Sequence, residues 1–176
     1  MVKRALAVAV VLCASACSSL PTPTLSSTHA KNSETPSGST AGDLAIVQRV
    51  VDGDTFIALV GARRFRVRLI GVNTPETVKP NTPVQCYGPE ASAYAKYVLT
   101  GKHIRLVYDV DRYDRYGRTL AYVYVGKTFF NLALVQQGYA VVETVPPDIA
   151  RVAEFVAAQR IARAKRLGLW LTCAFR

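Results

Sequence analysis

The sequence predicts an α+β, mainly β domain built as a small closed barrel of the OB type, with five strands and three helices. Three observations indicate this fold class. Five short segments have the periodicity of strands, one helical segment interrupts them after the third, and further helical segments follow the fifth. Because the helices do not alternate with the strands, a parallel α/β sheet is disfavoured.

The predicted strands are short apolar segments bounded by turn residues, such as Asp52-Gly53-Asp54 between the first two. In the third strand, apolar residues alternate with Arg64, Arg66 and Arg68, which is the pattern of a half-buried strand with a basic outer face. The five predicted strands cover residues 44–51, 55–60, 63–70, 103–108 and 119–125.

The first helix is predicted to begin at Gly88-Pro89-Glu90, because proline at the first helical position and an acidic first turn are typical start signals. It runs to Leu99, and a second, short helix covers residues 131–137. Pro146-Pro147-Asp148 is predicted to cap the last helix. The apolar face of that helix is predicted to comprise Val152, Phe155, Val156 and Ile161, and its basic outer face Arg160, Arg163, Lys165 and Arg166.

Residues 1–16 are predicted to be an export signal, because Lys3 and Arg4 precede a continuous apolar segment that ends in small residues. The apolar segment is too short to span a bilayer. Cys17 follows a sequence that resembles a bacterial lipoprotein box, although Ala14 stands where leucine is usual. We therefore expect export, with a cell-surface lipoprotein acylated at Cys17 favoured over plain secretion.

Residues 17–43 are rich in Ser, Thr and Pro and contain few large apolar residues. Such a segment buries too little apolar surface to offset its chain entropy, so we predict a disordered tether. The domain itself is predicted at 44–176. It keeps two cysteines, Cys86 and Cys173, and an isolated pair in an exported domain predicts a disulfide rather than a zinc site.

The chain carries 22 Lys and Arg against 12 Asp and Glu, a formal net charge of +10. This balance excludes an acidic, self-repelling disordered chain. It favours polyanionic partners such as nucleic acid, or an anionic membrane surface. Arginine is commoner than lysine, and its planar fork of donors matches a phosphate group.

Two segments carry candidate chemistry for a metal ion and a proton transfer. Asp52 and Asp54 flank a glycine, and paired carboxylates bind hard cations, although Asp-Gly is also the commonest hairpin turn. The third strand leads into Asn73-Thr74-Pro75-Glu76, where proline fixes the backbone and thereby the directions of its neighbours. Taken alone, this second segment also fits a proline turn with a solvated glutamate.

A third segment, Asp114-Arg115-Tyr116-Gly117-Arg118, combines cationic and aromatic side chains before the fifth strand. As an isolated feature it is an ordinary surface turn. Its composition nevertheless suits a phosphate group together with a stacked base.

Five motifs stand along the chain in one order. They are Val-Asp-Gly-Asp-Thr at 51–55, Arg-Leu-Ile-Gly-Val-Asn-Thr-Pro-Glu-Thr at 68–77, Tyr-Gly-Pro-Glu-Ala-Ser-Ala at 87–93, Asp-Arg-Tyr-Gly-Arg at 114–118 and Asn-Leu-Ala-Leu-Val-Gln-Gln-Gly at 131–138. Together they closely resemble the staphylococcal nuclease (thermonuclease) family. The resemblance covers about residues 45–170, nearly the whole domain.

The resemblance implies a calcium-dependent, sugar-nonspecific phosphodiesterase that hydrolyses single- and double-stranded DNA and RNA. By this likeness Asp54 and the Thr74 carbonyl bind Ca²⁺ and Glu76 is the general base. Arg68 and Arg118 then hold the phosphate. Each role agrees with the chemistry of its residue type, since arginine stabilises developing phosphoryl charge and a carboxylate can deprotonate water.

The sequence departs from the family pattern at Asn73, where the second metal carboxylate is expected. An amide oxygen has similar reach but no charge, so we expect weaker cation binding, open to other divalent ions, with Asp52 supplying negative charge. Arg115 and Tyr116 are predicted to bind the substrate. No protein partner is implied, and we expect a monomer.

Two other functions remain open at this point. A non-catalytic OB-fold lipoprotein that binds nucleic acid would explain the neutral Asn73, but Arg68, Glu76 and Arg118 together favour the enzyme. A surface lipoprotein that contacts anionic lipids or wall polymers would explain the charge but not the motifs.

Overall fold

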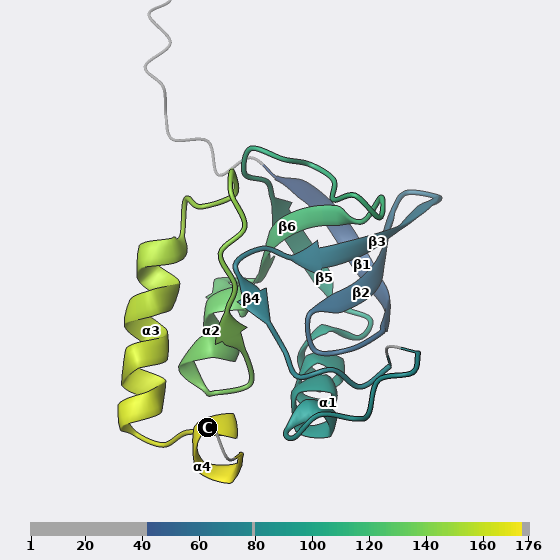
Figure 1. The fold of residues 1–176 in the computed structure, drawn as a ribbon. Coiled ribbons are helices and arrows are strands. Elements are labelled where there is room, and N and C mark those ends of the chain that lie inside the picture. Colours follow the sequence, from purple (N-terminus) through teal and green to yellow (C-terminus); the bar gives the residue numbers. More distant parts are fainter. Residues whose placement is uncertain (1–41, 79, 174–176) are drawn as a thin grey trace, which may run out of the picture. The chain divides into compact units, whose positions relative to one another are not determined.

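The computed structural model describes residues 42–78 and 80–173. The predicted signal at 1–16, Cys17 and the tether up to residue 41 lie outside the described residues and remain predictions. Among the helices of the described residues, none is both long and apolar enough to cross a bilayer. The predicted fold class is confirmed, because five strands form a closed mixed barrel accompanied by three helices of seven or more residues in this part of the chain (Figure 1).

Antiparallel pairing joins the barrel strands in the order β3-β2-β1-β5-β6. The barrel closes where β3 pairs with β6 in parallel, with Val67 opposite Thr119 and Leu69 opposite Ala121. This closure places the end of β3 beside the start of β6, although the two segments are far apart in the sequence. The strands are β1 (Asp43–Val50), β2 (Thr55–Val60), β3 (Arg63–Leu69), β5 (His103–Val107) and β6 (Thr119–Val125).

The remaining elements pack against the barrel or connect its strands. A two-stranded sheet pairs β4 with β8 and so brings the segment after the barrel closure beside the chain that leaves α2. Sequence patterns did not predict these two-residue strands, because so short a segment has no periodicity to detect. The elements are α1 (Gly88–Leu99), α2 (Phe130–Gln136), α3 (Val152–Ala164), α4 (Leu169–Thr172), β4 (Val72–Asn73), β7 (Thr128–Phe129) and β8 (Val141–Val142).

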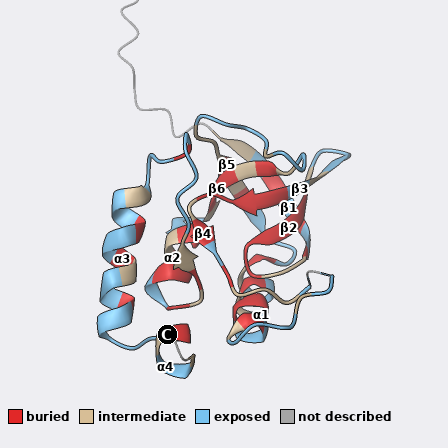
Figure 2. Cartoon of the chain, in the orientation of Figure 1, coloured by how far each residue is buried: buried red, intermediate tan, exposed pale blue. Residues whose placement is uncertain are grey.

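The core fills the barrel and continues between the barrel and the helices. Figure 2 shows buried residues along the strands and on the helix faces that point toward them. Phe56 and Leu106 are buried strand residues, while Leu99 of α1 and Phe130 of α2 extend the same cluster. The alternating apolar residues of the strands are therefore buried in the core, as their period of two predicts.

Helix α3 differs from its prediction in the residues that it buries. Phe155 and Ala158 face the core, as does Ala162 one turn further on. The inward orientation expected for Val156 and Ile161 is wrong, because their exposed fractions are 50% and 52%. The buried face of α3 therefore consists of one aromatic residue and two alanines, and the larger aliphatic residues lie outside it.

The start of α3 also differs from its prediction. The helix begins at Val152 with Arg151 as its N-cap residue, so the expected cap at Pro146-Pro147-Asp148 is wrong. Asp148 is buried, and its Oδ1 accepts a hydrogen bond from the backbone N–H of Asp111 at 2.8 Å. The aspartate thus fastens two loops together instead of capping a helix.

Two residues fix the corner where the chain leaves the barrel after β3. Gly71 has a φ of +80°, and a β-carbon there would lie 2.3 Å from Cε2 of Phe155. Asn131 is fully buried, where its Oδ1 accepts from the N–H of Val123 and its Nδ2 donates to the carbonyl of Ile70, both at 2.9 Å. These contacts hold the β3–β4 corner against α2, α3 and β6.

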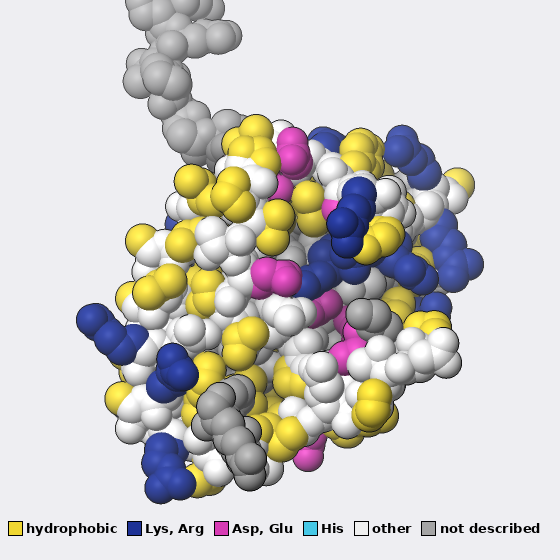
Figure 3. All heavy atoms as spheres, viewed as in Figure 1, with side chains coloured by type: hydrophobic (Ala, Val, Ile, Leu, Met, Phe, Trp, Pro, Cys, Tyr) yellow, Lys and Arg dark blue, Asp and Glu magenta, His cyan; other side chains and the backbone are white. Residues whose placement is uncertain are grey.

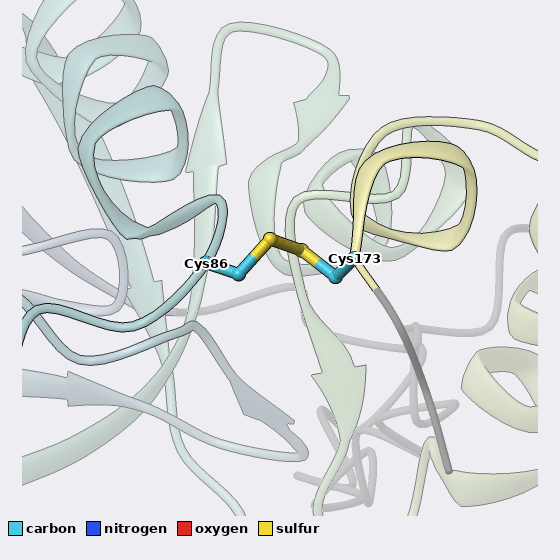
Figure 4. The surroundings of a disulfide bond; sticks show 2 residues. All are labelled: Cys86 and Cys173. Atoms are coloured by element: carbon cyan, nitrogen blue, oxygen red, sulfur yellow. A yellow bond between two sulfur atoms is a disulfide. The ribbon is translucent and has the colours of Figure 1, made fainter.

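A disulfide joins Cys86, just before α1, to Cys173 after α4, with a Cα–Cα distance of 5.9 Å (Figure 4). The predicted pairing is confirmed. The bond ties the C-terminal end of the described chain to the segment that follows Glu76.

Replacement of both cysteines by serine is expected to lower the free energy of unfolding. The two cysteines are 87 residues apart, so the open chain gains loop entropy worth about 4 to 5 kcal/mol. Urea unfolding of the oxidised wild type and of the Cys86→Ser/Cys173→Ser protein measures the difference. Unfolding of the wild type in a reducing agent repeats the test without substitution, and equal free energies in all three samples would contradict it.

Candidate active site

Asp54 lies at the start of β2, in the turn that follows β1, and is buried. Its Oδ2 accepts hydrogen bonds from the N–H of Thr74 at 2.8 Å and from the Thr74 hydroxyl at 3.0 Å. Its Oδ1 accepts from the hydroxyl of Thr55 at 3.0 Å. The carboxylate therefore links the β1–β2 turn to the segment after β4, twenty residues further along the chain.

The turn itself brings two carboxylates together. Oδ1 of Asp52 accepts a hydrogen bond from the N–H of Asp54 at 3.1 Å. A β-carbon at Gly53 would lie 2.7 Å from the Thr74 side chain, so the close approach of the two segments requires glycine there. Burial, together with the negative charge of Asp54, raises the pKa of Asp52 to about 6.

Arg68 lies on β3 at the barrel closure and is surrounded by acceptors. Its Nη1 donates to the carbonyls of Val72 at 2.7 Å and Leu69 at 3.1 Å, and it lies 3.2 Å from Oδ2 of Asp54. Its Nη2 donates to Oδ1 of Asn73 at 3.3 Å and to Oε2 of Glu143 at 2.9 Å. The guanidinium is thereby held in one orientation.

This position corrects one expectation about β3. Arg64 and Arg66 lie on an exposed basic face as predicted, whereas Arg68 is buried. The alternation pattern alone placed all three on the same solvent-facing side. At the end of β3 the outer face is covered by the β4–β8 sheet, so the last arginine points into the molecule.

Glu76 follows Pro75 in the loop before α1. Its Oε1 accepts hydrogen bonds from the N–H groups of Thr77 and Val78, both at 2.8 Å, and its own N–H donates to Oε1 of Gln85 at 2.9 Å. The loop therefore positions the carboxylate through its own backbone.

One cavity of about 170 Å³ unites the predicted catalytic and metal-binding residues. The polar side chains that line it are three carboxyl groups, two hydroxyl groups, one amide and two guanidinium groups. The described residues contain no cluster of three Asp, Glu, His or Cys side chains arranged to hold a metal ion. The predicted residues that line the cavity are Asp52, Asp54, Arg68, Asn73, Thr74, Glu76 and Arg118.

The loop before β6 is organised by Asp114. Its Oδ1 accepts hydrogen bonds from the N–H groups of Tyr116 and Arg118, both at 2.9 Å, and its Oδ2 lies 2.6 Å from Nε of Arg118. Burial opposes ionisation, but the hydrogen bonds from Arg118 and Tyr116 and the charge of Arg118 together hold the pKa of Asp114 below its usual value. This loop aims the Arg118 side chain at the cavity.

A second, larger cavity of about 480 Å³ lies beside the first and shares Arg68 and Arg118 with it. The predicted substrate-binding residues line this larger cavity. Nη2 of Arg115 donates to the hydroxyl of Tyr116 at 2.6 Å, and both side chains are exposed. Figure 3 shows acidic and basic side chains next to one another near the middle of this face, and more Lys and Arg on the side where β2 and β3 lie.

Sequence patterns missed two residues of this region. Asp114 belongs to a recognised motif, but nothing in the motif distinguished it as the acceptor that orders the loop. Glu143 is 75 residues from Arg68 in the sequence, and its contact depends on the β4–β8 pairing. Because that pairing has no sequence signal, the contact was not predictable.

The barrel, the buried Arg68 and the two cavities that share Arg68 and Arg118 define an OB-barrel protein with an arginine-containing site. Residues 66–172 match the family described as staphylococcal nuclease homologue. A thermonuclease of Staphylococcus intermedius is 48% identical over 129 residues, which cover 73% of this chain and 77% of the relative. A thermonuclease of Staphylococcus hyicus is 47% identical over 124 residues, covering 70% and 73%.

A more distant relative, endonuclease YncB of Bacillus subtilis, is 36% identical over 126 residues, which cover 70% of this chain and 60% of that protein. The chain belongs to the staphylococcal nuclease family. The sequence-based predictions of this family and of a nuclease enzyme are thereby confirmed.

Substitution of Asp114 by alanine is expected to loosen the loop that carries Arg118. The amides of Tyr116 and Arg118 lose their acceptor, so their hydrogen exchange should quicken by about fivefold to tenfold, as a lost hydrogen bond of about 1 kcal/mol implies. Asp114→Asn retains an acceptor and serves as the control.

The same loop has an expected pH dependence. Because the pKa of Asp114 is lowered in the folded protein, its stabilising contribution is complete above the unfolded value near 3.8. The contribution is lost as the pH falls below that value. Hydrogen exchange of the loop amides is measured at about pH 5, where the carboxylate is ionised, and is corrected for the intrinsic exchange rate. Equal corrected rates in wild type and Asp114→Ala would contradict the assignment.

Proposed function

We propose that the protein is an exported, metal-dependent endonuclease that hydrolyses the phosphodiester bonds of both DNA and RNA, with Ca²⁺ as the metal. One observation carries this proposal: a single cavity brings Asp54, Glu76, Arg68 and Arg118 together from separate segments of the chain. A phosphodiester is an anion, so its hydrolysis needs positive charge at the phosphate and a base for the attacking water. The cavity supplies both.

The residues at the cavity fit a hard divalent cation. Asp54 and Asp52 provide carboxylates, Thr74 a carbonyl and Asn73 an amide oxygen, and oxygen ligands of these kinds suit Ca²⁺. The raised pKa of Asp52 reflects burial and the repulsion between two neighbouring carboxylates, and a bound cation relieves that repulsion. When bound, the metal supplies Lewis-acid polarisation of a phosphoryl oxygen.

The two arginines are proposed to bind the phosphate from two directions. Arg68 approaches from β3 and Arg118 from the loop before β6, and both line the same cavity. A guanidinium is always charged and donates to two oxygens at once, so the pair stabilises the additional charge that develops at phosphorus. Glu76, in the same cavity, is proposed to orient and deprotonate the attacking water, worth about 10²- to 10⁴-fold in rate.

The larger cavity is proposed to receive the nucleotide next to the scissile phosphate. Arg115 and Tyr116 line it, and an aromatic ring beside a guanidinium suits a base with its phosphate. Exposed Arg64 and Arg66 on β3 extend the positive surface and favour binding of a polyanion. Single- and double-stranded nucleic acids are both proposed substrates.

The cellular location is part of the proposal. The Cys86–Cys173 disulfide supports an oxidising compartment, and thus export. Acylation at Cys17 and a monomeric state are proposed from the sequence alone.

The second candidate function is a nucleic-acid-binding protein of the same fold without catalysis. Asn73 favours it, because a neutral ligand replaces an expected carboxylate. The two candidates differ in one outcome, which is cleavage.

Glu76→Gln is expected to lower kcat on single-stranded DNA by about 10²- to 10⁴-fold, since the base is lost while the side-chain shape is kept. Arg118→Ala should lower it comparably, and Glu154→Gln, at an exposed position on α3, is the control. Cleavage is measured with the wild type and variants in millimolar Ca²⁺ and in chelator. Binding without cleavage by the wild type would favour the second candidate, and cleavage in chelator would overturn the metal assignment.

Asn73→Asp is expected to strengthen Ca²⁺ binding by about tenfold, because a carboxylate adds charge to the ligand set. Calorimetric titration of Ca²⁺ measures this affinity without any need for turnover. Gln136→Glu, at the exposed end of α2, serves as the control, because it also adds one negative charge but lies outside the cavity. An unchanged affinity in Asn73→Asp would place the cation away from residue 73.

A further inference from the structure

We propose that Glu143 is a displaceable internal anion that occupies Arg68 in the free protein and sets the affinity of the site for phosphate. The inference rests on the proposed function in one respect, namely that substrate phosphate binds Arg68. It assigns a role to a residue outside the predicted catalytic and metal-binding set.

The hydrogen bonds of Arg68 provide the first argument. Each terminal nitrogen of a guanidinium carries two hydrogens. Those of Nη1 are directed at the carbonyls of Leu69 and Val72, and those of Nη2 at Asn73 and Glu143. A phosphate oxygen that bonds to Nη2 therefore displaces one of these two acceptors or shares its hydrogen.

The two acceptors on Nη2 differ in charge and distance. Asn73 is a neutral amide at 3.3 Å, whereas Glu143 is a carboxylate at 2.9 Å. A carboxylate on an arginine makes the stronger, charge-assisted bond, and it also repels an incoming phosphate. Glu143 is thus the main competitor of phosphate at this nitrogen.

The mobility of the Glu143 side chain provides the second argument. Its backbone is fixed, because Val142 pairs with Val72 and the N–H of Glu143 donates to the carbonyl of Gly71 at 3.1 Å. Its side chain is 45% exposed, while that of Asp54, the other carboxylate on Arg68, is 8% exposed. Glu143 can rotate into solvent, and Asp54 stays in place.

The position of Glu143 in the larger cavity gives the third argument. It lines this cavity together with Arg68 and Arg118, so it lies where a nucleic-acid strand that enters the cavity meets the phosphate site. Displacement costs the same free energy for every anion. A small anion with few other contacts is therefore excluded from Arg68, whereas a nucleic-acid strand that the exposed arginines also hold still binds to Arg68.

The test compares Glu143→Gln with Glu154→Gln in the full-length protein. Glu154 is a matched control, because its side chain is 41% exposed and forms an ion pair with Arg151, so both variants remove one negative charge from a half-exposed glutamate that is paired with an arginine. Binding of inorganic phosphate is measured by calorimetry at fixed low salt. Glu143→Gln should tighten phosphate binding by about fivefold to thirtyfold over Glu154→Gln, as expected for loss of a half-exposed charge-assisted competitor.

Steady-state cleavage of single-stranded DNA supplies a second readout. Because Glu143 is displaced in both the bound substrate and the transition state, KM should fall by a similar factor while kcat stays within about twofold. Glu143→Ala should tighten phosphate binding at least as much as Glu143→Gln, since it removes the acceptor as well as the charge. Thermal unfolding confirms that each variant is folded.

The inference is overturned if Glu143→Gln and Glu143→Ala bind phosphate no more tightly than Glu154→Gln does. Weaker binding overturns it too, since it means that Glu143 orients Arg68 for substrate. The two proposals fail separately: tighter phosphate binding in a protein that cleaves nothing supports this inference and contradicts the nuclease, whereas cleavage with unchanged phosphate affinity does the reverse.

Discussion

The buried contact between Arg68 and Asp54 is the interaction on which the arrangement of the site depends. It joins the end of β3 to the β1–β2 turn at the point where the barrel closes. A buried charge without a partner costs far more than the pair contributes, so neither residue is replaceable alone. Thr74 also donates to Asp54, and the Val72 carbonyl also accepts from Arg68. The same contacts that satisfy two buried charges therefore fix the directions of the groups that line the small cavity.

The barrel was predictable from the sequence because its signals are local. Strands β2 and β6 begin and end at the predicted residues, since turn residues bound a clean apolar segment in each case. The small cavity was predictable for another reason: Asp54, Glu76 and Arg118 lie in motifs whose combined order is specific to one family. Each motif alone also fitted an ordinary turn, and the fold was needed to bring the three into one cavity.

The features that sequence patterns did not predict depend on contacts between distant segments of the chain. The inward turn of Arg68 follows from cover by the β4–β8 sheet, whose strands are too short to leave a pattern. In α3, the buried face contains Ala158 and Ala162, whereas a hydrophobicity pattern favours the larger Val156 and Ile161. Glu143 reaches Arg68 only because the β4–β8 pairing brings their segments together. Periodicity describes one element at a time and does not report how elements meet.

The two cavities have a common wall, since Arg68 and Arg118 line both. A ligand confined to one cavity contacts only the part of each guanidinium that lines that cavity. A ligand that extends into both cavities contacts more of Arg68 and Arg118. The number of contacts that Arg68 and Arg118 make therefore rises with the length of an anionic ligand, because only a longer ligand reaches both cavities.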